Sequence, residues 1–182
     1  MHSYKNSIHE KEAKKILGEL LSPDIFLCTS YEILPEIREY ERTSTTVVNA
    51  YLGPVIKSYL GNFSKRILDV GISAPCYVMQ SSGGQMLFKS AIRSPAYLLE
   101  SGPAAGVIAA VELAKKKNIK EVITLDIGGT TAKTAIIENF EPKRTSEYEV
   151  GSGINLSSKL TRGAGYAVKL PFIDISEIGA GG

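Results

Sequence analysis

The sequence predicts an α/β protein, because helical and strand-like spacings of apolar residues alternate along its 182 residues. The clearest helix opens at Gly102-Pro103, where Ser101 or Gly102 can act as cap, and ends near Asn118. Two apolar strands follow over residues 122–126 and 132–137, and the glycines between them predict a β-hairpin. The composition, 43% hydrophobic and 22% charged, is that of an ordinary soluble globular protein.

The other elements follow from local patterns. Ser7 and Glu10 have capping-box spacing at the start of a helix over residues 8–21, whose apolar face comprises Ile16, Leu17, Leu20 and Leu21. A helix over residues 45–60 contains Gly53-Pro54, which predicts a kink or break. Its apolar residues at helical spacing are Val48, Leu52, Val55, Ile56 and Tyr59. Short strands are expected at 25–29, 76–80, 144–150 and 172–175, and a Gly- and Ser-rich loop at 151–165.

Several classes of function are disfavoured. The net charge of +2 and the absence of a long basic run argue against nucleic acid, since the run Lys115-Lys116-Lys117 falls where a helix should end. No apolar stretch of about 18 residues exists, so no membrane span is expected. Cys28 and Cys76 lie in apolar runs without CxxC spacing, which favours buried thiols in the reducing cytoplasm. The two histidines have no ligand partners in sequence, so no zinc site is expected.

The segment from Asp126 to Thr131 is the strongest candidate site. An apolar strand delivers the Asp126 carboxylate to its end, where Mg²⁺ can be held together with phosphates. Gly128 and Gly129 allow the backbone to present N–H groups to an anion, and Thr130 and Thr131 add hydroxyls. The alternative is an ordinary hairpin turn.

Three further segments carry weaker motifs. The first could bind phosphate or substrate and the second an anion, and each of these two could equally be structural; the third could make a second phosphate or nucleoside contact. The first is the turn after the 76–80 strand, with Ser82, Gly83 and Gly84. The second is the helix start at Gly102, preceded by Glu100, which is expected to be a solvated or pairing carboxylate more than a metal ligand. The third follows the last strand, with Asp174, Gly179 and Gly181. A polar run over residues 38–46 is interpreted as a solvated loop and helix cap.

Taken in order, these segments resemble one family, the hydantoinase A / 5-oxoprolinase / acetone carboxylase β-subunit group. The resemblance rests on residues 36–51, 79–84, 101–106, 126–130 and 174–182, and it covers nearly the whole chain. It implies a ribonuclease-H-like fold, similar to actin, sugar kinases and the chaperone ATPase, in which two lobes close on ATP. Residues 1–75 would be the tail of the first lobe with connecting helices, and residues 76–182 the start of the second. A first-lobe Asp-x-Gly-Gly-Thr hairpin is missing, so we expect an internal piece of a larger enzyme.

The resemblance also implies an activity. ATP with Mg²⁺ at Asp126 would phosphorylate an amide oxygen, and water would then open a hydantoin or 5-oxoproline ring. A second subunit or domain of the hydantoinase B type is expected, and an oligomer is possible. The alternatives are an ATP-dependent carboxylase β-type subunit, a small-molecule kinase of the same fold, and a non-catalytic interaction module. An iron–sulfur activator ATPase would need more cysteines than the two present.

One residue departs from the family pattern. Many members have an acid where this sequence has Lys133, which weakens any metal role at that position. Lys133 is expected either to pair with phosphate or to face solvent.

Overall fold

The computed structural model describes residues 2–150 and 165–179 and confirms an α/β protein. The chain forms two compact units. Unit 1 comprises Met1–Val78 and Met86–Ala96, and unit 2 comprises Met79–Gln85 and Tyr97–Gly182. A short hairpin of β1 (Tyr77–Met79) and β2 (Gln85–Leu87) carries the chain from one unit to the other and back. No helix among the described residues is long and apolar enough to span a membrane.

Unit 1 is mainly helical, with α1 (Ile8–Leu20), α2 (Ser30–Ile33), α3 (Glu39–Asp69) and α4 (Phe88–Arg93). The strand predicted at 25–29 is wrong, because that segment has no regular structure and leads into α2. The predicted capping box at Ser7 is also wrong, since Asn6 Oδ1 accepts from the backbone N–H of Ile8 instead. The apolar residues of α1 are at least 37% exposed, so they form no buried face among the described residues.

A capping box does occur at α2, between Thr29 and Glu32. The Thr29 backbone N–H and hydroxyl both donate to the Glu32 carboxylate, at 3.2 and 2.8 Å. Lys14 adds an ion pair at 2.6 Å. Partial burial acts to raise the pKa of Glu32, but these hydrogen bonds and the lysine charge lower it below its ordinary value.

Helix α3 is longer than predicted and runs through Pro54 without interruption in its assignment. The ring of Phe26 lies against Gly53, where a Cβ atom would be 2.3 Å from ring carbons. Tertiary packing therefore helps to hold a helix that the Gly-Pro pair weakens. The predicted buried stripe is partly wrong, because Val48 is buried whereas Val55 and Tyr59 are 67% and 62% exposed.

The polar run over residues 38–46 is not a solvated loop, since most of it forms the first turns of α3. Arg42 is only 4% exposed, donates to the Glu36 carbonyl at 2.9 Å, and lies over the Tyr4 ring. The cysteine prediction is also only partly right. Cys28 and Cys76 are free thiols, but both are partly exposed.

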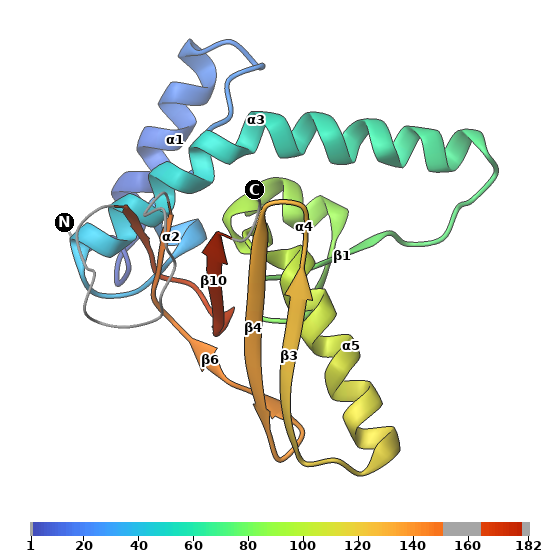
Figure 1. The fold of residues 1–182 in the computed structure, drawn as a ribbon. Coiled ribbons are helices and arrows are strands. Elements are labelled where there is room, and N and C mark those ends of the chain that lie inside the picture. Colours follow the sequence, from blue (N-terminus) through green and yellow to red (C-terminus); the bar gives the residue numbers. More distant parts are fainter. Residues whose placement is uncertain (1, 151–164, 180–182) are drawn as a thin grey trace. The chain divides into compact units, whose positions relative to one another are not determined.

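Unit 2 is built on an antiparallel sheet in which β4 (Thr131–Glu138) lies between β3 (Glu121–Ile127) and β10 (Ile175–Gly179), as Figure 1 shows. The predicted hairpin is thereby confirmed. The short strand β5 (Glu141–Pro142) also pairs with β4. The strand predicted at 144–150 is divided into β6 (Arg144–Thr145), which pairs with β9 (Phe172–Ile173), and β7 (Tyr148–Val150), which pairs with β8 (Tyr166–Val168).

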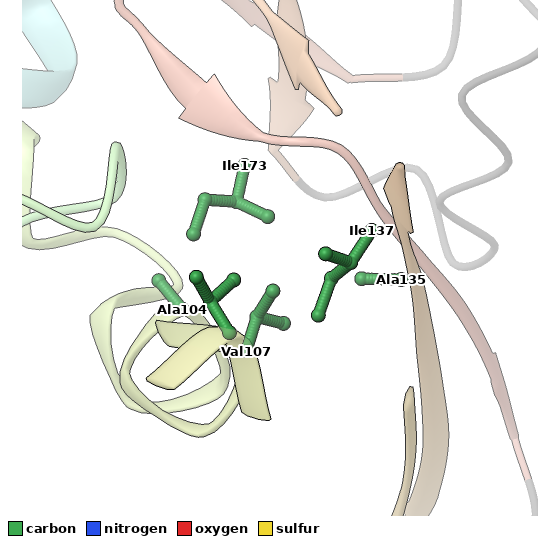
Figure 2. Close-up of a cluster of buried hydrophobic side chains, with 6 residues drawn as sticks. Ala104, Val107, Ala135, Ile137 and Ile173 are labelled. Atoms are coloured by element: carbon green, nitrogen blue, oxygen red, sulfur yellow. The ribbon is translucent and has the colours of Figure 1, made fainter. Parts of the chain in front are cut away.

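Helix α5 (Ser101–Lys117) covers one face of this sheet. Ala104 and Val107 point from the helix toward Ile137, Ala135 and Ile173 (Figure 2), and all five are no more than 5% exposed. The helix ends at Asn118, whose φ of 55° is the left-handed conformation of a C-cap, directly after the three lysines of its last turn. This packing fixes the position of the helix start over the sheet.

Candidate phosphate-binding site

The β3–β4 hairpin exposes a set of polar groups at its tip. The backbone N–H of Gly128 donates to the Thr131 carbonyl at 2.9 Å and closes the turn. Asp126 and Thr130 are exposed, and neither side chain makes a hydrogen bond or ion pair within the described part of the chain. The hairpin therefore presents one carboxylate and a hydroxyl that its own fold leaves available.

The two glycines of the turn are not required by its internal packing. A Cβ atom at Gly129 would have nothing within 4 Å, and one at Gly128 would approach only the Thr131 carbonyl, at an ordinary 3.8 Å. Neither residue has the positive φ that favours glycine. The absence of side chains instead leaves open space over the backbone, which suits the close approach of an anion to N–H groups.

A row of charged side chains crosses the sheet next to the hairpin. In the strand register, Lys133 of β4 lies opposite Asp126 of β3 and opposite Glu177 of β10. The three side chains therefore project from the same face of the sheet. This is the face that α5 covers, because Ala135 and Ile137, two and four residues after Lys133, point to the same side of β4 and pack against α5. Lys133 Nζ lies 2.8 Å from Glu100 Oε2 and 3.4 Å from Glu177 Oε1. Of the two alternatives for Lys133, exposure to solvent is therefore wrong, because its side chain is only 18% exposed and paired with two carboxylates.

Glu100 is the N-cap residue of α5, in place of the predicted Ser101 or Gly102. Its backbone is left-handed, with φ 55° and ψ 20°, a conformation that costs a non-glycine residue about 1–3 kcal/mol. The Tyr148 hydroxyl donates to Glu100 Oε1 at 3.2 Å, and the Tyr148 ring stacks on Phe172 with centroids 4.8 Å apart. Side-chain contacts thus hold Glu100 in this strained position, and Glu100 is a pairing carboxylate as predicted.

The environment fixes the charge states in this network. Burial, and then the neighbouring charge of Glu100, raise the pKa of Tyr148, so its hydroxyl stays protonated and able to donate. Burial acts to lower the pKa of Lys133, but the carboxylates of Glu100 and Glu177 outweigh it and raise the pKa above its ordinary value.

The ion pair of Glu100 with Lys133 places the start of α5 at the hairpin end of the sheet, because Lys133 lies two residues after Thr131. Gly102 is in the first turn, with nothing within 4 Å of the position of a Cβ atom. The first N–H groups of a helix have no partner within the helix, and its dipole favours anions there. The helix start and the hairpin therefore lie at one place in the fold.

The turn predicted at residues 81–84 is present, but the protein's own structure uses most of its groups. Ser81 is buried, donates through its hydroxyl to the Tyr97 carbonyl, and accepts from the Ile173 N–H. Gly83 has φ 82°, and a Cβ atom there would lie 2.6 Å from Ile108 Cδ1. Ser82 donates to Gln80. These contacts explain Gly83 as a structural glycine, and they do not bring Ser82, Gly83 or Gly84 to the hairpin.

The predicted residues near the end of the chain separate into different places. Gly179 pairs with Thr131 and so lies beside the hairpin. Asp174 lies five residues earlier, at roughly 17 Å along an extended chain. Its Oδ1 atom is buried and has no hydrogen-bond partner among the described residues, although most buried polar atoms have one. Gly181 lies outside the described residues.

Glu177 and Tyr148 were missed by sequence reasoning. Each lies in a short strand, Tyr148 in β7 and Glu177 in β10, and their positions in the sequence do not indicate the contacts with Glu100 and Lys133. Only the pairing of β10 with β4 and the stacking on Phe172 reveal their roles.

Comparison with known proteins decides the family. The hydantoinase/oxoprolinase family model matches residues 42–182. The chain belongs to the hydantoinase/oxoprolinase family. This confirms the resemblance found in the sequence. Among relatives of this family, an uncharacterised protein of Methanocaldococcus jannaschii is 51% identical over 182 residues, covering 100% of this chain and 26% of the relative.

Other relatives carry functional names. The caprolactamase subunit alpha of Pseudomonas jessenii is 34% identical over 182 residues, covering 99% of this chain and 24% of the relative. A nucleotide-free structure of acetone carboxylase superimposes with a TM-score of 0.80 at 26% identity, covering 100% of this chain and 24% of that chain. The chain thus spans about a quarter of the length of these relatives.

Proposed function

We propose that this chain forms an ATP-binding part of an ATP-dependent enzyme that hydrolyses cyclic amides. The observation that carries the proposal is the hairpin tip, where the side chains of Asp126 and Thr130 make no hydrogen bond or ion pair with any other described residue and two glycines leave the backbone open. The start of α5 and Gly179 lie at the same end of the sheet. A triphosphate needs this combination of backbone N–H groups, hydroxyls and a positive helix end.

The residues present fit a nucleotide with Mg²⁺ better than a resident metal. No three His, Cys, Asp or Glu side chains converge as metal ligands within residues 2–150 and 165–179. Mg²⁺ characteristically uses one or two protein carboxylates and takes its other ligands from phosphates and water. Asp126 would supply that carboxylate, Gly128 and Gly129 the N–H groups, and Thr130 and Thr131 the hydroxyls. Asp174 lies elsewhere in the same unit, and we propose that its Oδ1 atom, which has no partner among the described residues, accepts a hydrogen bond from the nucleotide.

Phosphorylation of the amide oxygen would make the carbonyl carbon electrophilic enough for water to attack it. The γ-phosphoryl group bonds to the carbonyl oxygen and ADP departs. One water then opens the C–N bond to give an acyl phosphate, and a second water releases inorganic phosphate. The chain's part in these steps is positioning and charge neutralisation at the phosphates.

The relatives support this reaction class and one alternative. The caprolactamase is described as ATP-dependent and shares 34% identity with this chain, which favours ring opening. The acetone carboxylase structure has a TM-score of 0.80, which keeps ATP-dependent carboxylation as the second candidate. Since the caprolactamase relative is an alpha subunit, we also propose a partner subunit. The free thiols are in keeping with a cytoplasmic location.

The test is isothermal titration of ATP–Mg²⁺ into the chain, with Asp126→Ala as the site variant. Glu121→Ala is the matched control, because Glu121 is an exposed carboxylate at the other end of the same strand. We expect weak binding by the chain, no detectable binding by Asp126→Ala, and unchanged binding by Glu121→Ala. Equal binding by all three would overturn the proposal, as would no binding by a chain shown by circular dichroism to be folded.

A further inference from the structure

Three segments that are distant in sequence meet at one ammonium group. Glu100 lies 33 residues before Lys133, and Glu177 lies 44 residues after it (177 minus 133). Each contact is adjacent to a proposed phosphate-binding segment. Glu100 directly precedes the first turn of α5. Lys133 lies two residues after Thr131, which ends the turn of the hairpin, and Glu177 lies two residues before Gly179.

Direct binding of phosphate by Lys133 does not agree with these contacts. The ammonium is already paired with two carboxylates, at 2.8 and 3.4 Å, in a partly buried position. A phosphate contact would require at least one pair to break and would bring a negative ligand next to two negative side chains. The geometry instead suits a group that acts on its protein neighbours.

The contacts of Glu100 show how Lys133 acts on its neighbours. Its left-handed backbone turns the chain into α5, and its two carboxylate oxygens are held separately, one by Lys133 and the other by Tyr148. Tyr148 in turn is fixed by its stacking on Phe172, which is 1% exposed. Loss of the Lys133 contact would release Glu100 Oε2 and leave the Tyr148 hydrogen bond to Oε1 as the side-chain restraint on Glu100 among the described residues.

Building on the proposed function, we propose that Lys133 is a positioning residue. Through its ion pairs with Glu100 and Glu177, it holds the start of α5, the hairpin turn and the end of β10 in one arrangement. The backbone N–H groups of the three segments can then bind the same phosphates. Only the identity of the ligand rests on the proposed function. The arrangement of the three segments can be tested without any ligand.

The test uses Lys133→Met, Glu100→Gln and the double variant. Simple electrostatics predicts that removing the Glu100 charge strengthens binding of an anionic nucleotide. Positioning predicts the opposite, with ATP–Mg²⁺ binding weakened roughly tenfold by either single substitution and no further by the double variant. Lys115→Met is the matched control, because Lys115 pairs with Glu112 at 2.9 Å on the exposed surface of α5.

Hydrogen–deuterium exchange of the ligand-free variants supplies the second measurement. We expect faster exchange at the hydrogen-bonded amides of Ala104, Gly128 and residues 176–179 in Lys133→Met and Glu100→Gln, and no change there in Lys115→Met. Unchanged exchange in all three segments would overturn the proposal. The proposal would also be overturned if the Glu100→Gln variant bound ATP as tightly as the unaltered chain while the Lys133→Met variant bound it more weakly. That result would indicate direct contact between Lys133 and phosphate. If the unaltered chain binds no ATP, the proposed function fails, and exchange alone still decides the role of Lys133.

Discussion

Two glycine substitutions in two turns of unit 2 should have opposite effects. At Gly129 the φ angle is not in the left-handed region and a Cβ atom would meet nothing within 4 Å. Alanine there restricts the unfolded chain without straining the folded one, so Gly129→Ala should leave the free energy of unfolding unchanged or raise it by up to about 1 kcal/mol. At Gly83 the φ of 82° costs alanine about 1–2 kcal/mol, and the 2.6 Å approach to Ile108 adds to it.

The assay is urea unfolding followed by circular dichroism, with ATP–Mg²⁺ titration of the same samples. Gly83→Ala should lower the free energy of unfolding by about 2–4 kcal/mol, with strain and overpacking combined. Gly129→Ala should stay folded yet bind ATP more weakly, because its methyl group occupies the space left for phosphate. Alanine is tolerated wherever the native backbone conformation is open to it. A fall of more than about 1 kcal/mol in the free energy of unfolding of Gly129→Ala would therefore refute the inference that this glycine serves a ligand.

Three further predictions concern stability. Ile137→Ala should lower the free energy of unfolding by about 2–5 kcal/mol in urea titration, because Ile137 is fully buried against α5, and a loss below about 1 kcal/mol would contradict the core assignment. Asn49→Ala should cost about 1–3 kcal/mol in the same assay, because buried Asn49 donates to the Arg93 carbonyl and accepts from the Ala96 N–H; a neutral result would show that water replaces both bonds. The pKa of Glu32 is lowered in the folded state, so its stabilising effect is present above its ordinary pKa of 4.5 and is lost as pH falls through the folded-state value. Glu32→Gln should therefore have a lower melting temperature than the unaltered chain at pH 7, and this difference should shrink in melts at successively lower pH below 4.5; a difference that does not change with pH would count against this linkage.

Local patterns were sufficient for the part of the fold that carries the site. The β3–β4 hairpin and α5 follow from periodicity, two glycines and the Gly102-Pro103 opening, because these elements depend mainly on neighbouring residues. Failures occurred where tertiary contacts decide. Residues 25–29 read as a strand but pack as an irregular segment, with the Phe26 ring on Gly53 of α3.

The candidate site divides in the same way. Asp126 and its hairpin were accessible to sequence reasoning, because the motif is contiguous. The network around Lys133 was not, because Glu100, Tyr148 and Glu177 reach it from separate strands and a helix start. Asp174 and Gly179 were predicted within one segment, and the extended β10 places them at opposite ends of the strand.

The most direct test of the central claim is a ¹⁵N–¹H correlation spectrum of the chain titrated with ATP–Mg²⁺. The amides of Gly128, Gly129, Thr130 and Thr131 should shift most, together with those of Gly102 and Gly179 at the same end of the sheet. Amides at the far end, such as Glu121 and Glu138, serve as internal controls and should not move. Shifts confined to unit 1, or a folded spectrum that does not change at millimolar ATP, would contradict the assignment of the hairpin as the phosphate site.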